Sequence, residues 1–155
     1  MALQPKISVQ AGDFDVSAET ALLTLNSNNI GAIVSFTGLC RDEDGRLNAL
    51  ELEHYPGMAE EKLSEIARQA AERWPLSGLT IIHRFGMIKP GANIVLVIAT
   101  SSHRRAAFEA ADFLMDFLKT DAPFWKKEHL KDGSKGDWVE AKCDDEADKK
   151  RWQQD

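Results

Sequence analysis

Cysteine and histidine are scarce in this sequence, which limits the metal and redox chemistry open to it. Its 155 residues include two cysteines, Cys40 and Cys143, with no CxxC pair, and four widely separated histidines. Nothing has the spacing of a structural zinc site, so we expect no bound metal. The first residues lack the basic-then-apolar layout of a signal peptide. We therefore expect a cytoplasmic, reducing compartment in which both cysteines remain free thiols.

Long apolar runs, nucleotide-binding glycine motifs and excess positive charge are also missing. The longest apolar run, 94–99, has six residues, whereas crossing a bilayer takes about 20, so we expect no membrane span. The ten glycines never form GxG, and no GxxxxGKS/T occurs, so the dinucleotide fingerprint and the P-loop are both absent. With 19 basic and 25 acidic side chains the net charge is −6, which argues against nucleic acid or an anionic membrane as a general partner.

The overall amino-acid composition is typical of one folded domain. Hydrophobic residues make up 43% and charged residues 28%, close to the average for globular proteins. The length is that of one ordinary domain. We therefore expect residues 1–155 to form one unit with a charged C-terminal tail from about residue 142.

Two amphipathic helices are the clearest expected elements. Between 59 and 74 the apolar residues recur at helical spacing. A second apolar stripe from 103 to 120 includes Phe108, and Ser102 is a candidate N-cap. A shorter helix is expected to begin at a cap on Ser17.

Strand patterns lie between these helices. They occur at residues 13–16, 32–37, 50–55, 79–84 and 93–101, with a last short strand around 138–141. The strand at 32–37 is expected to be buried, residues 41–46 to form an exposed loop, and the chain after residue 123 to be irregular. These elements predict an α+β fold in a single domain, with a mainly antiparallel sheet and two long helices.

The start of the second long helix runs against helix stability. Arg104 and Arg105, together with His103 when it is protonated, put positive charge at the positive end of the helix dipole, where acidic residues are favoured. Unpaired backbone N–H groups joined by arginine forks suit an anion, so an anionic ligand is one interpretation. The alternative is an exposed basic turn paired with acidic neighbours.

The end of the same helix and the segment after it concentrate lysines and large aromatic residues. Lys119, Lys126 and Lys127 lie on either side of Phe124 and Trp125. A lysine partly buried beside apolar rings can act as a nucleophile or general acid/base. The alternative, favoured on spacing alone, is that Lys119 stabilises the helix end and the aromatic residues belong to the core.

Two other reactive side chains are better explained by packing. Cys40 could be a nucleophile, but a thiol without a placed base is more often a small buried hydrophobic residue. His54 shares a strand face with Leu50 and Leu52, so a hydrogen-bonded core histidine is the favoured interpretation.

Several short motifs together resemble the family of large, catalytic subunits of molybdopterin synthase. They are Phe36-Thr37-Gly38 with Arg41, residues 52–58, His83-Arg84 with Gly86, Ser102-His103-Arg104, Lys119-Thr120, Ala122-Pro123-Phe124-Trp125-Lys126 with Glu128, and Trp138-Val139-Glu140-Ala141. They span about residues 30–142, and the Ala-Pro-Phe-Trp-Lys run is the most specific of them.

This resemblance implies an α/β hammerhead-like fold and a homodimer of large subunits, each binding a small ubiquitin-like sulfur-carrier subunit in a heterotetramer. The family's reaction uses no metal, and no cofactor is expected. The carrier inserts a C-terminal Gly-Gly tail that ends as a thiocarboxylate. Two sulfurs then pass to cyclic pyranopterin monophosphate and form the dithiolene of molybdopterin.

The resemblance also implies roles for particular residues. Lys119 and Lys126 are expected to be catalytic, and the residues expected to bind the substrate or the carrier tail are Leu39, Cys40, Arg41, His103, Arg104, Lys127 and Glu128. There are two departures from the family pattern. Leu39 stands where family members often carry a basic residue, beside a shorter loop at 42–46, and Lys142 replaces an arginine.

Two other functions stay open at this point. Phe124, Trp125 and the nearby lysines could belong to a binding module without chemistry, which docks a protein or stacks single-stranded nucleic acid. Alternatively, His103 and Arg104 could serve a different phosphate-ester enzyme that needs no protein partner.

Overall fold

Seven strands and three helices follow one another in the computed structural model, which describes residues 3–120, 122–139 and 152. In chain order they are β1 (Lys6–Gln10), α1 (Val16–Thr24), β2 (Ala32–Leu39), β3 (Leu47–His54), α2 (Met58–Arg73), β4 (Leu76–Arg84), β5 (Gly86–Ile88), β6 (Asn93–Ser101), α3 (Arg104–Thr120) and β7 (Phe124–Leu130). Within those residues no helix is both long enough and apolar enough to cross a membrane.

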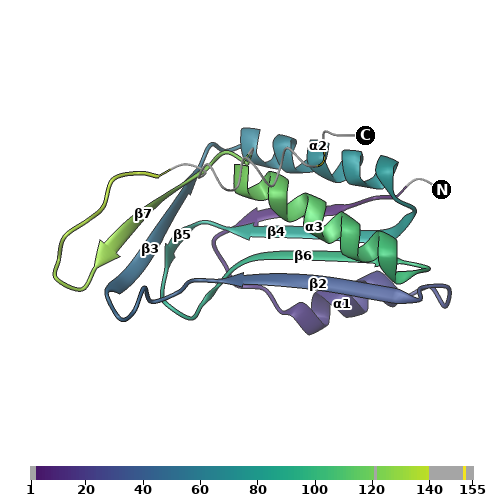
Figure 1. Cartoon of the computed structure of the whole chain (residues 1–155), viewed down its shortest axis with the longest axis horizontal. Helices are drawn as coiled ribbons and strands as arrows, with labels where there is room; N and C mark the ends of the chain where they lie inside the picture. Colours follow the sequence, from purple (N-terminus) through teal and green to yellow (C-terminus); the bar gives the residue numbers. More distant parts are fainter. Residues whose placement is uncertain (1–2, 121, 140–151, 153–155) are drawn as a thin grey trace.

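A four-stranded sheet forms the body of the molecule, and helices cover both of its faces (Figure 1). Its strand order is β1-β4-β6-β2, in which only the β1–β4 pair is parallel. Helices α2 and α3 lie over one face, whereas α1 packs against the other face through Val16 and Leu23. The expected α+β fold with two long helices and mainly antiparallel strands is confirmed.

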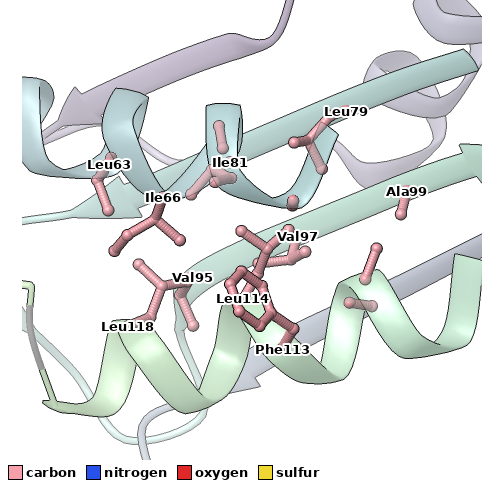
Figure 2. Packing of buried hydrophobic residues seen from close by; sticks show 14 residues of the cluster. Leu63, Ile66, Leu79, Ile81, Val95, Val97, Ala99, Phe113, Leu114 and Leu118 are labelled. Carbon is pink, nitrogen blue, oxygen red and sulfur yellow. The ribbon is translucent and has the colours of Figure 1, made fainter. Parts of the chain in front are cut away.

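The main core lies between the two long helices and the sheet, as Figure 2 shows. Alternate residues of a strand point to opposite faces, so one set from β4 and β6 meets the apolar stripes of α2 and α3. The residues labelled in this core include Leu63, Ile66, Leu79, Ile81, Val95, Val97, Phe113, Leu114 and Leu118. Phe108 was expected on the stripe of α3 but is 59% exposed, because the buried stripe runs through Phe113 instead.

A second sheet, of three antiparallel strands in the order β5-β3-β7, projects from one end of the first (Figure 1). The expectation that the chain is irregular after residue 123 is therefore wrong. Strand β7 has no apolar–polar alternation, so only its pairing with the distant β3 defines it as a strand. Of the strand expected at 138–141, Val139 forms a bridge with Lys126, and residues 140 and 141 lie outside the described residues.

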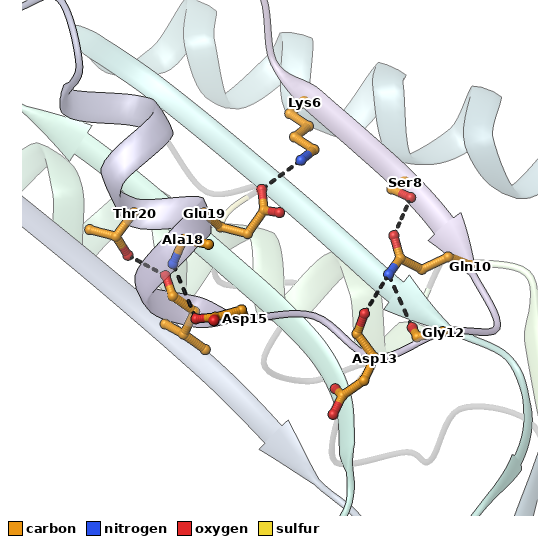
Figure 3. A network of polar contacts seen from close by, with 10 residues as sticks. Lys6, Ser8, Gln10, Gly12, Asp13, Asp15, Ala18, Glu19 and Thr20 are labelled. Atoms are coloured by element: carbon orange, nitrogen blue, oxygen red, sulfur yellow. Dashed lines mark hydrogen bonds and ion pairs between the residues drawn. The ribbon is translucent and has the colours of Figure 1, made fainter.

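The strand expected at 13–16 is also wrong, because the N-terminal strand is β1 and a loop precedes α1. Figure 3 shows the side chains that form this loop. Gln10 Nε2 donates to two loop carbonyl oxygens at 3.0 Å. The carboxylate of Asp15, rather than Ser17, caps α1 by accepting a hydrogen bond from the N–H of Ala18 at 3.1 Å. Polar side chains satisfy the loop backbone here in place of a strand partner.

Strand β2, which was expected to be buried, forms an edge of the main sheet. Ile33 and Phe36 are accordingly 44% and 41% exposed. The strand starts where Gly31 lets the backbone pass close to the start of α3, since a Cβ on Gly31 would lie 2.1 Å from the carbonyl oxygen of Ser102. Helix α3 begins at Arg104, so Ser102 lies before the helix, and its side chain makes no hydrogen bond with a described residue.

The charged tail expected from residue 142 lies outside the described residues, with the exception of Trp152. The indole N–H of Trp152 donates to the carboxylate of Asp116. Its ring packs edge-on against Trp74 and Phe113, with centroid distances of 5.7 and 5.6 Å. This part of the tail therefore packs against α2 and α3.

Candidate active site

Both lysines expected to be catalytic line one pocket, which lies where α3 ends beside the β3–β7 pair. This lysine pocket has a volume of about 290 Å³. Lys119 belongs to the last turn of α3, and Lys126 lies on β7 opposite Leu52. The other described lining residues are Phe36, Gly38, Leu39, Leu50, Leu52, His83, Ile94, Val95, Met115, Leu118, Phe124, Trp125 and Val139.

Packing and strand pairing fix where the two lysines lie. The end of α3 is anchored by Leu114 and Leu118, which are buried in the main core just before Lys119. Lys126 is held from both sides, because β7 pairs with β3 on one side and with Val139 on the other. The two backbone N–H···O bonds between Lys126 and Val139 measure 3.2 and 2.8 Å. The lysines are thus presented by two separate, well-supported elements.

The lysine pocket is cationic with largely apolar walls. None of its described lining residues is acidic. The ammonium of Lys119 forms no hydrogen bond or ion pair with any described residue. A cation beside low-dielectric walls favours an anion, or a carbonyl oxygen that becomes negative in a transition state. The pocket is therefore suited to acyl or phosphate chemistry.

His83 also lines this pocket, although the His83-Arg84 motif that contributed to the family resemblance gave it no role. Its side chain is almost fully buried, and its ring stacks on Phe124 with centroids 3.7 Å apart and planes at 12°. Its Nδ1 lies 2.9 Å from the carbonyl oxygen of Arg84. Burial is the main cause that lowers the pKa of His83 to about 4, with smaller effects of the charges on His54 and Lys119. The ring is therefore neutral at pH 7.

A second pocket, at the other end of α3, contains the expected anion site. This arginine pocket has a volume of about 570 Å³ and is lined by Gly31, Ser102, His103, Arg104, Arg105, Phe108 and Glu109. Arg105 forms an ion pair with Glu109 at 3.7 Å. His103 and Arg104 are exposed, and neither forms a hydrogen bond or ion pair with a described residue. The alternative interpretation, a basic turn paired with acidic neighbours, therefore applies to Arg105, whereas His103 and Arg104 are available to an anion.

The two pockets do not come together within one chain. Fifteen positions along α3 separate Arg104 from Lys119, which corresponds to about 22 Å of helix rise. A small ligand held by Lys119 is therefore out of reach of Arg104 in the same chain.

Comparison with known proteins decides the family. The protein-family model described as "MoaE protein" matches residues 9–121 of this chain. The chain is 66% identical over 148 residues to the molybdopterin synthase catalytic subunit of Brucella melitensis, covering 96% of this chain and 91% of that one. The chain belongs to the MoaE family.

Solved structures of MoaE proteins have the same fold. The MoaE protein of Burkholderia ambifaria superposes with a TM-score of 0.84 at 44% identity, over 98% of this chain and 100% of that one. Molybdopterin synthase from Staphylococcus aureus gives a TM-score of 0.76 at 30% identity, over 84% of this chain and 94% of that one. The fold and the sulfurtransferase family implied by the sequence resemblance are confirmed.

Three neighbouring residues of this MoaE family member differ in their access to the lysine pocket. Leu39 lines the pocket and is 54% exposed. Cys40 is buried outside it, and burial, followed by the negative charge of Glu43, raises the pKa of its thiol. This supports the interpretation of Cys40 as a small buried hydrophobic residue. Arg41 is exposed, lies 3.7 Å from Glu43, and lines neither pocket.

Two further residues that the MoaE resemblance implicated lie on β7 beyond the pocket lining. Lys127 follows Lys126 and so points to the opposite face, where its Nζ lies 4.9 Å from the ring centroid of Trp138. Glu128 shares the face of Lys126 but is not among the pocket's lining residues. Both therefore stay predictions for binding a partner or substrate outside the pocket.

Within the described residues of this MoaE chain, the histidines and cysteines do not form a metal site. No group of three His, Cys, Asp or Glu side chains lies close enough there to hold an ion. His54 packs on Phe85 and Phe124 at centroid distances of 4.5 and 6.0 Å, and it lacks the hydrogen bond expected of it within the described residues. Lys142 and Cys143 lie outside those residues.

Proposed function

We propose that this chain transfers sulfur from the C-terminal thiocarboxylate of a small ubiquitin-like carrier subunit to cyclic pyranopterin monophosphate, and so builds the dithiolene of molybdopterin. Membership of the MoaE family supports the reaction class. The lysine pocket is the observation that carries the site, because it places two lysines between largely apolar walls and none of its described lining residues is acidic. The reaction as proposed needs no metal or cofactor.

Lys119 is proposed to stabilise the charge that develops at the carrier's carbonyl group. Each transfer first bonds the tail's sulfur to a carbon of the substrate in place of an oxygen, which leaves as water in one transfer and as the phosphate oxygen of the opening ring in the other. Water then adds to the tail's carbonyl carbon, the acyl carbon–sulfur bond breaks, and the tail leaves as a carboxylate while the sulfur remains on the substrate. The oxyanion formed in that addition is offset by the Lys119 ammonium, which can also move the proton.

Lys126 is proposed to act on the substrate side of the same pocket. Its position on β7 opposes Leu52, on a different element from Lys119, so the two ammonium groups can contact two reacting partners. As the dithiolene forms, the cyclic phosphate opens and an oxygen leaves with negative charge. An ammonium near that oxygen stabilises it or orients the pterin.

His103 and Arg104 are proposed to bind the phosphate from a second copy of the chain. Their pocket is about 22 Å of helix rise away from Lys119 in the same chain. Apolar surface lies close to it, since Phe108 lines the arginine pocket and Ile33 follows Gly31 on the exposed edge strand β2. Such surface is typical of an interface. A homodimer would bury it and could bring the arginine pocket of one copy to the lysine pocket of the other.

The test is reconstitution of the reaction with the thiocarboxylated carrier and cyclic pyranopterin monophosphate, with molybdopterin as the readout. Wild type is expected to form product. The Lys119→Ala variant is expected to lose about 10²- to 10³-fold in rate, as when a single oxyanion-stabilising group is removed.

A matched control separates the pocket from a general effect of losing a lysine. Lys62 lies on α2 beside Glu65, outside both pockets, so Lys62→Ala should retain the wild-type rate. Carrier binding by Lys119→Ala, measured by gel filtration, should match wild type. Full activity of Lys119→Ala would remove Lys119 from the mechanism, and absence of product with wild type in a verified complex would overturn the proposed function.

A cytoplasmic location is part of the same proposal. Cys40 is a buried free thiol, which is typical of proteins that work in a reducing compartment.

A further inference from the structure

His83 is the buried polar side chain of the lysine pocket that the proposed mechanism leaves unused. It lies on β4, opposite Val95 of β6, at the end of the main sheet nearest to the last turn of α3. Only 8% of the residue is exposed. A buried imidazole beside two lysines needs an explanation, because core positions of β4 otherwise hold Leu79 and Ile81.

The hydrogen bond to the backbone fixes which ring nitrogen carries the proton. The carbonyl oxygen of Arg84 can only accept, so Nδ1, 2.9 Å away, must be the donor. In a neutral ring the other nitrogen, Nε2, then bears a lone pair and can only accept. No described residue donates to Nε2, although the residue is more than nine-tenths buried.

The stack on Phe124 fixes the plane in which that lone pair lies. The two rings are nearly parallel, with planes at 12° and centroids 3.7 Å apart, and both residues line the lysine pocket. The Nε2 lone pair lies in the plane of the imidazole. A donor must therefore approach edge-on in the imidazole plane, which is nearly parallel to the Phe124 ring stacked on it.

His83 supplies what the rest of the pocket lacks. The lysine ammonium groups can only donate hydrogen bonds. Among the described lining residues, His83 is the only side chain with a nitrogen or oxygen that can accept one. A ligand that carries both negative charge and N–H donors could thus pair its negative charge with the lysines and donate a hydrogen bond to His83.

We infer that His83 is a specificity-determining binding residue, whose Nε2 accepts a hydrogen bond from a ring N–H of the pterin in cyclic pyranopterin monophosphate. This inference rests on the proposed function. The thiocarboxylate group of the carrier's tail has only acceptor atoms and pairs with the lysines, and the tail's amide N–H groups belong to an open chain and not to a flat ring. A pterin presents N–H groups in the plane of a flat heterocycle, which matches the fixed, edge-on lone pair of His83.

The experiment compares His83→Phe and His83→Gln with wild type in the complete complex with the carrier. Phenylalanine keeps a flat ring on Phe124 but removes the acceptor, whereas glutamine can place its Oε1 near the position of Nε2. For His83→Phe, the KM for cyclic pyranopterin monophosphate should rise about tenfold, the effect of losing one hydrogen bond to a buried group. The kcat and the KM for the carrier should stay near wild type, and His83→Gln should recover most of the loss.

A binding measurement keeps this inference separate from the proposed reaction. Cyclic pyranopterin monophosphate is titrated calorimetrically into complexes whose carrier ends in an ordinary carboxylate, so that no turnover occurs. Weaker binding by His83→Phe than by wild type and His83→Gln supports the inference even if the sulfur transfer fails. Equal affinities for all three, or a rise in the KM for the carrier instead, would overturn it. Circular dichroism and thermal melting confirm that the variants are folded before they are compared.

Discussion

The two ends of α3 carry two cationic pockets that are assembled in different ways. The arginine pocket is largely local, since His103, Arg104 and Arg105 are consecutive and Phe108 and Glu109 follow one turn later. The lysine pocket draws its described lining from six elements, β2, β3, β4, β6, α3 and β7. A local site can be recognised from a short stretch of sequence. A site assembled by the fold is visible in the sequence only through its most reactive residues.

The two pockets also differ in how strongly their charges act. The side chains of His103 and Arg104 are exposed to water, where charge interactions are weak and screened by salt. Lys119 and Lys126 lie beside Phe124, Trp125 and other apolar walls, where the same charge acts through a lower effective dielectric. The arginine pocket is therefore suited to holding an anion, and the lysine pocket to stabilising charge that changes during a reaction.

The largest expected effect is a loss of sulfur transfer that tests whether one active site combines the lysine pocket of one copy with the arginine pocket of the other. Lys119→Ala and Arg104→Ala homodimers should each lose about 10²-fold or more in sulfur transfer. A heterodimer of the two variants, isolated with two affinity tags, has one fully intact pair of pockets and one doubly altered pair. It should therefore recover about half of the wild-type rate, as two-fold symmetry requires.

A heterodimer as inactive as its parents would show that the arginine pocket does not complete a site across the dimer. A heterodimer of Lys119→Ala with wild type is the control, because it also contains one intact lysine pocket and should retain about half of the activity.

The same contrast explains what the sequence could predict. Both long helices followed from apolar residues at helical spacing, and α2 (Met58–Arg73) matches its expected bounds closely. Strand β7 was missed because its seven residues, Phe124–Leu130, carry four charged or histidine side chains, and nothing local signals a strand. Its partner β3 is about 70 residues earlier in the chain, and pairing over such a distance is decided by the fold.

The candidate site shows the same division at the level of single residues. Lys119 and Lys126 were identified from a motif, and the fold places both in one pocket. His83 belonged to a resemblance motif but was given no role, because it lies in the buried run of β4 and looks like any core position until the end of α3 is placed beside it. Only the structure shows that a core position of the sheet is also a pocket wall.

The next largest effect is a pH dependence of folding stability that arises at His83 in the lysine pocket. His83 has a pKa of about 4 in the folded protein and 6.5 in an ordinary environment. Between these values the unfolded state binds more protons, so the free energy of unfolding falls as pH is lowered through this window. Titration of His83 should remove about 3 kcal/mol of stability between pH 7 and pH 4. His54 and Lys119 are the other charged groups that act on it.

Urea unfolding at several pH values measures this dependence in wild type and in His83→Phe, which should lack that part of the loss. Ile81→Val, on the same face of β4, controls for simple weakening of the core, because it should lower stability by roughly 1 kcal/mol at every pH. If the stability of His83→Phe depended on pH as steeply as that of wild type, the imidazole would not be held neutral by burial.

A smaller effect is expected at the backbone that supports the arginine pocket. A Cβ on Gly31 would lie 2.1 Å from the carbonyl oxygen of Ser102, so β2 and the start of α3 would have to move apart. We expect Gly31→Ala to lower the free energy of unfolding by roughly 1–3 kcal/mol. Gly12→Ala is the matched control, because nothing lies within 4 Å of its added Cβ. Equal stability of the two variants in urea would contradict this role for Gly31.

The smallest expected effect separates two adjacent lysines on β7. Lys126 lines the lysine pocket, whereas Lys127 lies over the Trp138 ring on the opposite face, so their side chains have different surroundings. Of the two ligands predicted for Lys127, the carrier tail better suits a position outside the lysine pocket. Lys127→Ala should therefore leave the KM for cyclic pyranopterin monophosphate unchanged, and cost at most about 1 kcal/mol of stability from the lost cation–π contact. Lys126→Ala should instead impair sulfur transfer in the same assay. A similar rise in that KM for both variants would mean that substrate contacts β7 from both faces, and that the lysine pocket is only part of its binding site.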